Sequence, residues 1–246
     1  MRVAGACWPA PHRRGVLRLA AAAAASVPSG RGSPGMDNPV HVVLLGDSIF
    51  DNASYVGAGP DVTHQLRDLM GNGSRVSLNA RDGATLADIE RQLLAMPRGA
   101  THLVISAGGN DALIASGVLD APAHSVADAL DKLQTIAQGF RGLYGAMLAR
   151  IMAWKIPCAV CTIYDPRFPE PDRRRAATAA LALLNDSITR EAFSNGANLL
   201  DLRLICGEDE DFANAIEPSV IGGSKIAHAI RNFVRGDNVA SVVLAR

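Results

Sequence analysis

The chain has 246 residues, of which 48% are hydrophobic and 20% are charged. One globular core can serve this length, and the composition excludes disorder, a collagen-like chain and a small disulfide scaffold. The 24 basic and 24 acidic side chains sum to zero, but residues 1–35 carry five arginines and no acid. The remainder therefore holds 19 basic against 24 acidic side chains, a net charge of −5. A mildly acidic domain disfavours nucleic acid as a partner.

Residues 1–35 form a basic, alanine-rich leader with six consecutive alanines at positions 20–25. Its outline suits an export signal, and Arg13-Arg14 would suit a twin-arginine version. The alternative is that Met36 is the true start, so that the leader is disordered or not translated. We expect the latter, with a cytoplasmic domain over residues 36–246 and export as the alternative. The apolar run is too short to span a bilayer, so stable membrane insertion is not expected.

Short aliphatic runs alternate with helical stripes from residue 40 onward. Strands are predicted at residues 40–45, 74–79, 102–106, 156–163 and 197–202, and helices at 86–96, 125–154, from 171 and from about 218. This alternation is typical of an α/β fold with a five-stranded parallel sheet between two helical layers. The first, third and fourth strands are predicted to be buried on both faces. Glycines 139, 142 and 145 predict close packing or a bend in the longest helix.

Cys158 and Cys161 lie in the fourth predicted strand. Positions three apart on a strand face opposite sides, so this pair is predicted to supply core thiols rather than ligands of one metal ion. Neither a metal nor an organic cofactor is expected.

Three loops at the carboxyl ends of strands bring polar groups to one edge of the sheet, where parallel sheets carry their working residues. They read GDSIFDN at 46–52, NARDGAT at 79–85 and AGGND at 107–111. Together they predict a serine nucleophile, Ser48, with an oxyanion site formed by the backbone N–H groups of Ser48 and Gly83 and the side-chain amide of Asn110.

These three motifs resemble the first three blocks of the SGNH subgroup of GDSL-type serine esterases, lipases and acylhydrolases, in the same order. The similarity covers nearly all of residues 40–235. It implies a flavodoxin-like three-layer α/β/α sandwich with strand order 2-1-3-4-5. It also implies cofactor-free hydrolysis of small-molecule carboxylic esters through a Ser48 acyl-enzyme. Ser48 does not lie in a G-x-S-x-G elbow, which separates the chain from the α/β-hydrolase fold.

The fourth block of that family is D-x-x-H followed by proline, and here it reads Asn214-Ala-Ile-Glu217-Pro218. A carboxylate with a pKa of about 4.3 is a weak base unless burial raises the pKa by about two units or more. We expect Glu217 to be the base. In one alternative a histidine replaces it, and in another the fold is catalytically silent and binds an ester or glycan. The candidate histidines are His41, His64, His124 and His228, the first and last of which are expected to be structural.

The acidic run at residues 208–211 is expected to be a solvated loop rather than a cation site. A Glu217 and Asp211 pair of the glycosidase type is a further alternative. Gly57 and Gly59 follow their strand too late for a dinucleotide site. Substrate walls are expected from residues 111–125 and 164–171, and the sequence indicates no oligomeric state.

Overall fold

The computed structural model describes residues 39–237. The predicted leader at 1–35 and the domain start at residue 36 lie outside these residues. Five strands form one parallel sheet in the order β2-β1-β3-β4-β5. The strands are β1 (His41–Gly46), β2 (Arg75–Leu78), β3 (His102–Ser106), β4 (Cys158–Cys161) and β5 (Asn198–Leu200). All five predicted strands and their predicted order are confirmed.

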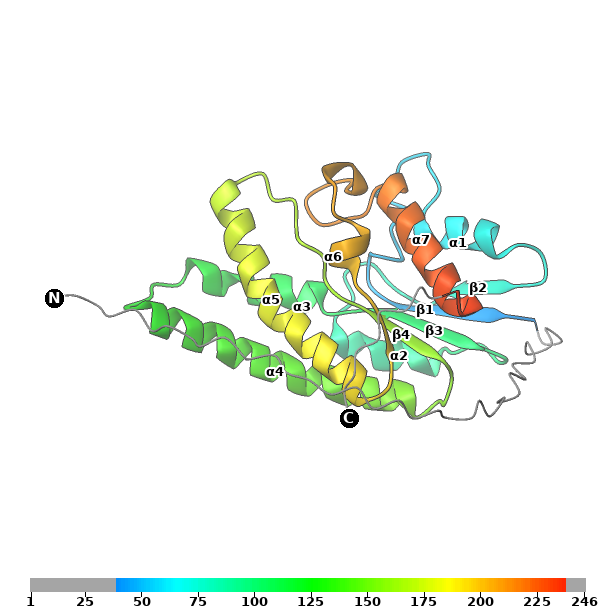
Figure 1. Cartoon of the computed structure of the whole chain (residues 1–246), viewed down its shortest axis with the longest axis horizontal. Coiled ribbons are helices and arrows are strands. Elements are labelled where there is room, and N and C mark those ends of the chain that lie inside the picture. Colours follow the sequence, from blue (N-terminus) through cyan, green and yellow to red (C-terminus); the bar gives the residue numbers. More distant parts are fainter. Residues whose placement is uncertain (1–38, 238–246) are drawn as a thin grey trace, which may run out of the picture. The chain divides into compact units, whose positions relative to one another are not determined.

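Helices cover both faces of this sheet, which gives the predicted three-layer sandwich (Figure 1). They are α1 (Val62–Met70), α2 (Ile89–Leu94), α3 (Gly109–Ala115), α4 (Val126–Met152), α5 (Pro171–Ser194), α6 (Leu202–Ile205) and α7 (Val220–Arg235). The 3-10 turns η1 (Leu86–Asp88), η2 (Ser116–Asp120) and η3 (Asp209–Asp211) connect them. Among residues 39–237 no helix is both long and apolar enough to cross a membrane.

Successive residues of the central strands enter different cores, because side chains alternate across a strand. Val43 and Leu45 of β1 pack with α2, α4 and α5, whereas Val42 and Leu44 pack with α1 and α7. Strands β1 and β4 are buried throughout, and β3 is buried except at His102, as predicted. Cys158 and Cys161 lie in the two opposite cores, which confirms that they are core thiols.

Helix α4 begins at the Ser125 N-cap, where the Ser125 side chain accepts a hydrogen bond from the Asp128 backbone N–H. Its 27 residues span about 40 Å, and its N-terminal part projects beyond the sheet (Figure 1). Close packing at its glycines is confirmed only at Gly145, where an added Cβ would lie 2.9 Å from Glu191 Oε2. The part of α4 that projects beyond the sheet can therefore line a site above the sheet.

Candidate active site

Ser48 lies just past the carboxyl end of β1, where the chain turns at Gly46. Gly46 has a φ of +127°, and an added Cβ would lie 1.7 Å from the Ser106 carbonyl oxygen, so only glycine fits there. The Gln92 side chain accepts a hydrogen bond from Gly46 N at 2.7 Å and donates one to Gly46 O at 2.8 Å. This pair of bonds fixes the turn that presents Ser48, and the Ser48 side chain is buried.

The Ser48 hydroxyl donates a hydrogen bond to Glu217 Oε1 at 3.0 Å, across 169 positions of sequence. Glu217 is only 4% exposed, and its Oε2 has no hydrogen-bond partner among residues 39–237. Burial raises the pKa of Glu217 to about 7, the hydrogen bond from Ser48 opposes this rise, and the charges of Asp47 and Asp82 add to it. Glu217, at the position where the resemblance predicts a histidine, is thus a buried carboxyl with a pKa raised to about 7.

Three side chains hold the loop that carries Glu217. Asn214 Oδ1 accepts hydrogen bonds from the backbone N–H groups of Ile216 and Glu217, both at 2.9 Å. The Tyr164 hydroxyl donates to the Ile216 carbonyl at 2.6 Å, and Asn52 Nδ2 donates to the Pro218 carbonyl at 3.2 Å. The peptide groups on both sides of Glu217 are therefore anchored.

Asn214 lies where the sequence resemblance predicts the aspartate of the fourth block. Its side-chain oxygen shapes the backbone of the turn and bonds to no atom of the Glu217 carboxyl. A carboxylate partner is useful to a histidine because it stabilises an imidazolium, whereas Glu217 becomes neutral when it takes up a proton. A glutamate in the role of base would therefore not need an aspartate partner.

Asn110 is the predicted side-chain donor of the oxyanion site. Its side-chain amide donates one hydrogen bond to the Ala84 carbonyl at 2.9 Å, and Asn110 lines the same cavity as Ser48. The neighbouring Asp111 accepts a hydrogen bond from Leu86 N at 3.0 Å. The loops after β2 and β3 are thereby joined, and one amide proton of Asn110 remains for a ligand.

Gly83 lies in the loop after β2 with a φ of +76°. Within the described part of the chain, neither its N–H nor that of Ser48 has a hydrogen-bond acceptor. Gly83 borders a shallow polar depression beside Arg81 and Asp82 rather than the cavity that contains Ser48. Both N–H groups are available as donors, and of the three predicted donor residues Ser48 and Asn110 line the cavity.

Asp47 is a functional candidate that the sequence analysis did not single out, although it lies inside the GDS motif. It is buried beside Ser48 and accepts hydrogen bonds from Ser106 Oγ at 3.1 Å and Ile49 N at 3.2 Å. Burial raises its pKa to about 7, against the lowering effect of these bonds. Its hydrogen bonds tie the nucleophile turn to the end of β3.

The alternative bases do not reach the site. No histidine between residues 39 and 237 lines the cavity. His41 bonds to Ser77 within the sheet, His64 pairs with Asp61 at the start of α1, His228 bonds to the Ser224 carbonyl, and His124 is exposed. The alternative in which one of these histidines replaces Glu217 is therefore wrong for this arrangement.

The acidic run at 208–211 is only partly the solvated loop that was expected. Glu208, Asp209 and Glu210 are exposed, but Asp211 is fully buried. Asp211 forms an ion pair with Lys225 of α7 at 2.6 Å and accepts a hydrogen bond from Glu208 N. Asp211 does not line the cavity with Glu217, so the glycosidase-type pair is also wrong, and Asp211 instead holds η3 against α7.

Ser48 and Glu217 lie together on the floor of a cavity of about 120 Å³. The residues that line it are predominantly apolar and come from α3, η2, α4, α5 and the segment after β4. The expected substrate walls at 111–125 and 164–171 both contribute, through Leu113 and Phe168 among others. This places a hydroxyl, a carboxyl and an amide donor at the base of an apolar site.

The chain is similar to known proteins in sequence and in fold. The profile of the "GDSL-like Lipase/Acylhydrolase family" matches residues 44–219. The chain belongs to this family, and it is a hydrolase of the class that acts on ester bonds. No protein with a curated description matches it.

Solved structures of this fold include an extracellular lipase from Streptomyces rimosus, which is 18% identical with a TM-score of 0.59 over 78% of this chain and 99% of that one. A phospholipase A1 from Streptomyces albidoflavus is 17% identical with a TM-score of 0.60 over 79% and 99%. An acetyl xylan esterase is 18% identical with a TM-score of 0.55 over 78% and 98%. These likenesses establish the fold.

Proposed function

We propose that the protein hydrolyses small-molecule carboxylic esters through a Ser48 acyl-enzyme, with Glu217 as the general base and no cofactor. The observation that carries this proposal is the 3.0 Å hydrogen bond from the Ser48 hydroxyl to Glu217 Oε1 on the floor of the cavity. A base works best when its pKa lies near the operating pH, and burial raises the pKa of Glu217 to about 7. Glu217 thus meets the requirement that an ordinary surface carboxylate fails.

In the first half-reaction Glu217 takes the hydroxyl proton while Ser48 Oγ attacks the ester carbon. The carbonyl oxygen becomes negative and is stabilised by the Asn110 amide and the Ser48 backbone N–H, the two predicted donors whose residues line the cavity. Glu217 then donates the proton to the leaving alcohol, and the acyl group stays on Ser48. In the second half-reaction Glu217 deprotonates a water molecule that attacks the acyl-enzyme. The acid leaves, and the proton returns to Ser48.

The test is hydrolysis of p-nitrophenyl butanoate by the wild-type chain and by Ser48→Ala, Glu217→Gln and Glu217→His. We expect Ser48→Ala and Glu217→Gln to lose at least 10²-fold in kcat, because each removes one half of the nucleophile and base pair. Glu217→His should retain more activity than Glu217→Gln, since imidazole can accept the proton. Equal rates for wild type and Ser48→Ala would exclude Ser48 as the nucleophile.

A protein that binds the ester without turnover is the competing outcome. Binding measured by calorimetry with no Ser48-dependent product release would identify it. Full activity of Glu217→Gln would remove Glu217 from the mechanism while leaving Ser48 in place.

A further inference from the structure

The cavity above Ser48 is walled by three helical segments, α3 with η2, α4 and α5. Their apolar side chains face one another across it: Leu113, Val118 and Leu119 from α3 and η2, Leu133 and Ile136 from α4, and Leu181 and Leu184 from α5. These walls lie where the N-terminal parts of α4 and α5 project past the sheet (Figure 1). The reacting atoms of an ester do not themselves require so much apolar surface around them.

The length of the cavity wall can be worked out along α5. The residues of α5 that line the cavity are Arg173, Ala177, Ala180, Leu181 and Leu184, which fall on a single helical stripe. From Arg173 to Leu184 the stripe covers eleven residue steps, or about 16 Å at ~1.5 Å each. Alanines at 177 and 180 leave room in the middle of the stripe.

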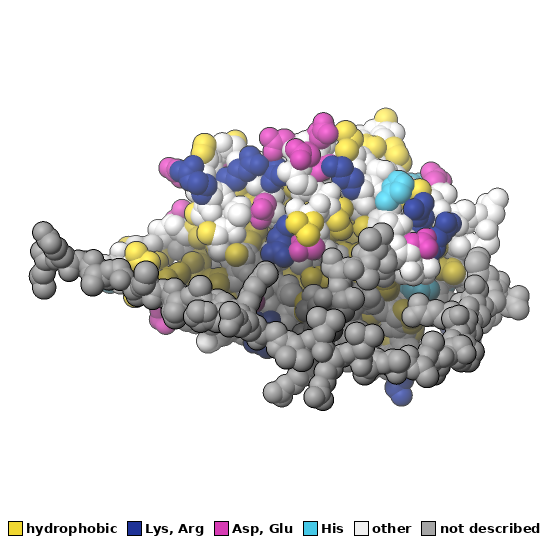
Figure 2. All heavy atoms as spheres, in the orientation of Figure 1, with side chains coloured by type: hydrophobic (Ala, Val, Ile, Leu, Met, Phe, Trp, Pro, Cys, Tyr) yellow, Lys and Arg dark blue, Asp and Glu magenta, His cyan; other side chains and the backbone are white. Residues whose placement is uncertain are grey.

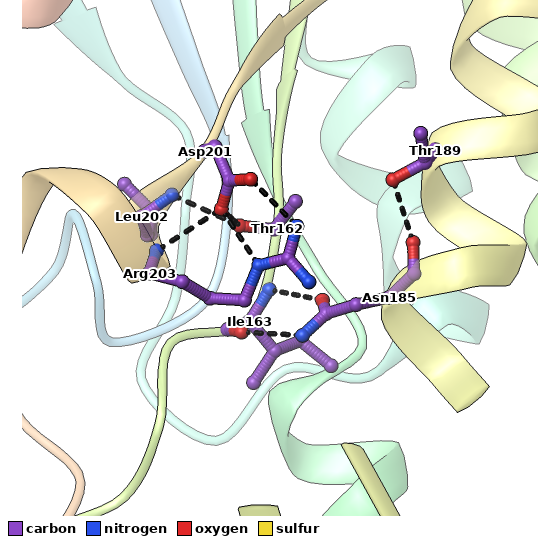
Figure 3. Close-up of polar contacts among 7 residues, drawn as sticks. All are labelled: Thr162, Ile163, Asn185, Thr189, Asp201, Leu202 and Arg203. Atoms are coloured by element: carbon purple, nitrogen blue, oxygen red, sulfur yellow. Dashed lines mark hydrogen bonds and ion pairs between the residues drawn. The ribbon is translucent and has the colours of Figure 1, made fainter. Parts of the chain in front are cut away.

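The end of this stripe near the sheet is closed by a hydrogen-bonded junction (Figure 3). Asn185 accepts a hydrogen bond from Ile163 N at 2.8 Å and donates one to Ile163 O at 2.7 Å. The Thr162 hydroxyl donates to Asp201 at 2.8 Å, and Asp201 pairs with Arg203. An acyl chain attached to Ser48 would therefore extend outward along α5 and not toward the sheet.

The outer end of the stripe is polar. Arg173 forms an ion pair with Asp120 at 2.8 Å, so the apolar wall ends at Arg173. Basic and acidic side chains alternate on the part of the surface where α5 begins (Figure 2). The site thus has a reactive floor, an apolar middle and a charged outer end.

We propose that this cavity is an acyl-chain site that selects medium-length acyl esters, from hexanoyl to octanoyl, with the acyl chain extended from Ser48 along α5 toward Arg173. This inference rests on the proposed function. The volume of about 120 Å³ is close to the ~150 Å³ of an apolar cavity that holds benzene, so it suits a chain of about six carbons or slightly more. An acetyl group leaves the apolar walls unfilled, and a much longer chain must pass the charged end.

The first test is the rate of hydrolysis of p-nitrophenyl acetate, butanoate, octanoate and hexadecanoate by the full chain. One buried methylene is worth about 0.8 kcal/mol, or about fourfold in kcat/KM. We expect kcat/KM for octanoate to exceed that for acetate at least tenfold, and hexadecanoate to fall below octanoate. A flat profile, or acetate as the best substrate, would overturn the proposal even if Ser48 is the nucleophile.

The second test fills the stripe at two depths. Ala180→Leu, nearer the closed end, should shift the preference to shorter acyl chains more than Ala177→Leu does. Ala179→Leu is the matched control, because Ala179 is on the same helix but exposed and outside the cavity. Equal chain-length profiles for Ala180→Leu and Ala179→Leu would show that the acyl chain does not lie along α5.

A third measurement separates this proposal from the proposed function. Calorimetry with Ser48→Ala should show tighter binding of ethyl octanoate than of ethyl acetate, and Ala180→Leu in that background should remove the difference. This result supports the acyl site even if the protein hydrolyses no ester. Equal binding of the two esters would refute it even if hydrolysis is observed.

Discussion

Substitution of Glu217 by glutamine should stabilise the protein above neutral pH while it removes the base. The pKa of Glu217 is about 7 in the folded protein against a reference value of 4.5, so the folded state holds this proton more tightly than the unfolded state does. The carboxyl of Glu217 is therefore mostly neutral in the folded protein below about pH 7. As the pH rises from about 4.5 to about 7, the unfolded state loses this proton before the folded state does, so the free energy of unfolding falls. Glutamine does not ionise and avoids this cost.

The size of the effect follows from the two pKa values. Between about pH 5 and pH 8 a shift from 4.5 to about 7 changes the free energy of unfolding by about 2.5 kcal/mol, and solvent screening of a carboxyl that lines a cavity reduces this to about 2 kcal/mol. The quantity to compare is the difference between Glu217→Gln and wild type at the two pH values. Any constant cost of burying the new amide then cancels.

Urea unfolding followed by circular dichroism measures this difference. Glu217→Gln should gain about 2 kcal/mol on wild type as the pH rises from about 5 to about 8. Glu210→Gln is the control, because Glu210 lies in the same region but is exposed, and it should show no such gain. A pH-independent difference between Glu217→Gln and wild type would refute the claim that Glu217 is a buried carboxyl with a raised pKa.

Three further predictions concern catalysis. The kcat/KM for p-nitrophenyl butanoate should rise with pH through an apparent pKa near 7 and then level off, since Glu217 acts as a base only when ionised; a profile already level at about pH 5.5 would contradict this. Asn110→Ala should lower kcat by about 10²- to 10³-fold with little change in KM, and an unchanged kcat would remove Asn110 from the oxyanion site. Tyr164→Phe removes the hydroxyl that holds the Ile216 carbonyl, so it should lower kcat about tenfold and spread the rise of kcat/KM over a wider pH range. A loss of stability without these kinetic changes would make the role of Tyr164 merely structural.

The strands and Ser48 were predictable because their signals are local. Each strand is a short aliphatic run, and the carboxyl ends of parallel strands share one edge, which brings Ser48 and Asn110 together. The raised pKa of Glu217, on which its proposed role as base depends, was not predictable from the sequence, because burial causes it and burial is a property of the fold.

The groups that hold the site were not predictable, because their partners are far away in the sequence. Gln92 bonds to Gly46 across 46 positions, Tyr164 to Ile216 across 52, and Asn52 to Pro218 across 166. None of these pairs follows a helical or strand period. Asp211 was misjudged for a related reason: four consecutive acids indicate a solvated loop, but Lys225 of α7 pairs with Asp211 and permits its burial.

The most direct test of the account is covalent capture of the nucleophile by a fluorophosphonate, which phosphonylates an activated serine, read by intact mass and peptide mapping. At about pH 8 the wild-type chain should gain a single adduct on Ser48, and Glu217→Gln should react at least 10²-fold more slowly because Ser48 then has no base. An adduct on another residue, or equal labelling rates for wild type and Glu217→Gln, would contradict the assignment of Ser48 and Glu217 as nucleophile and base.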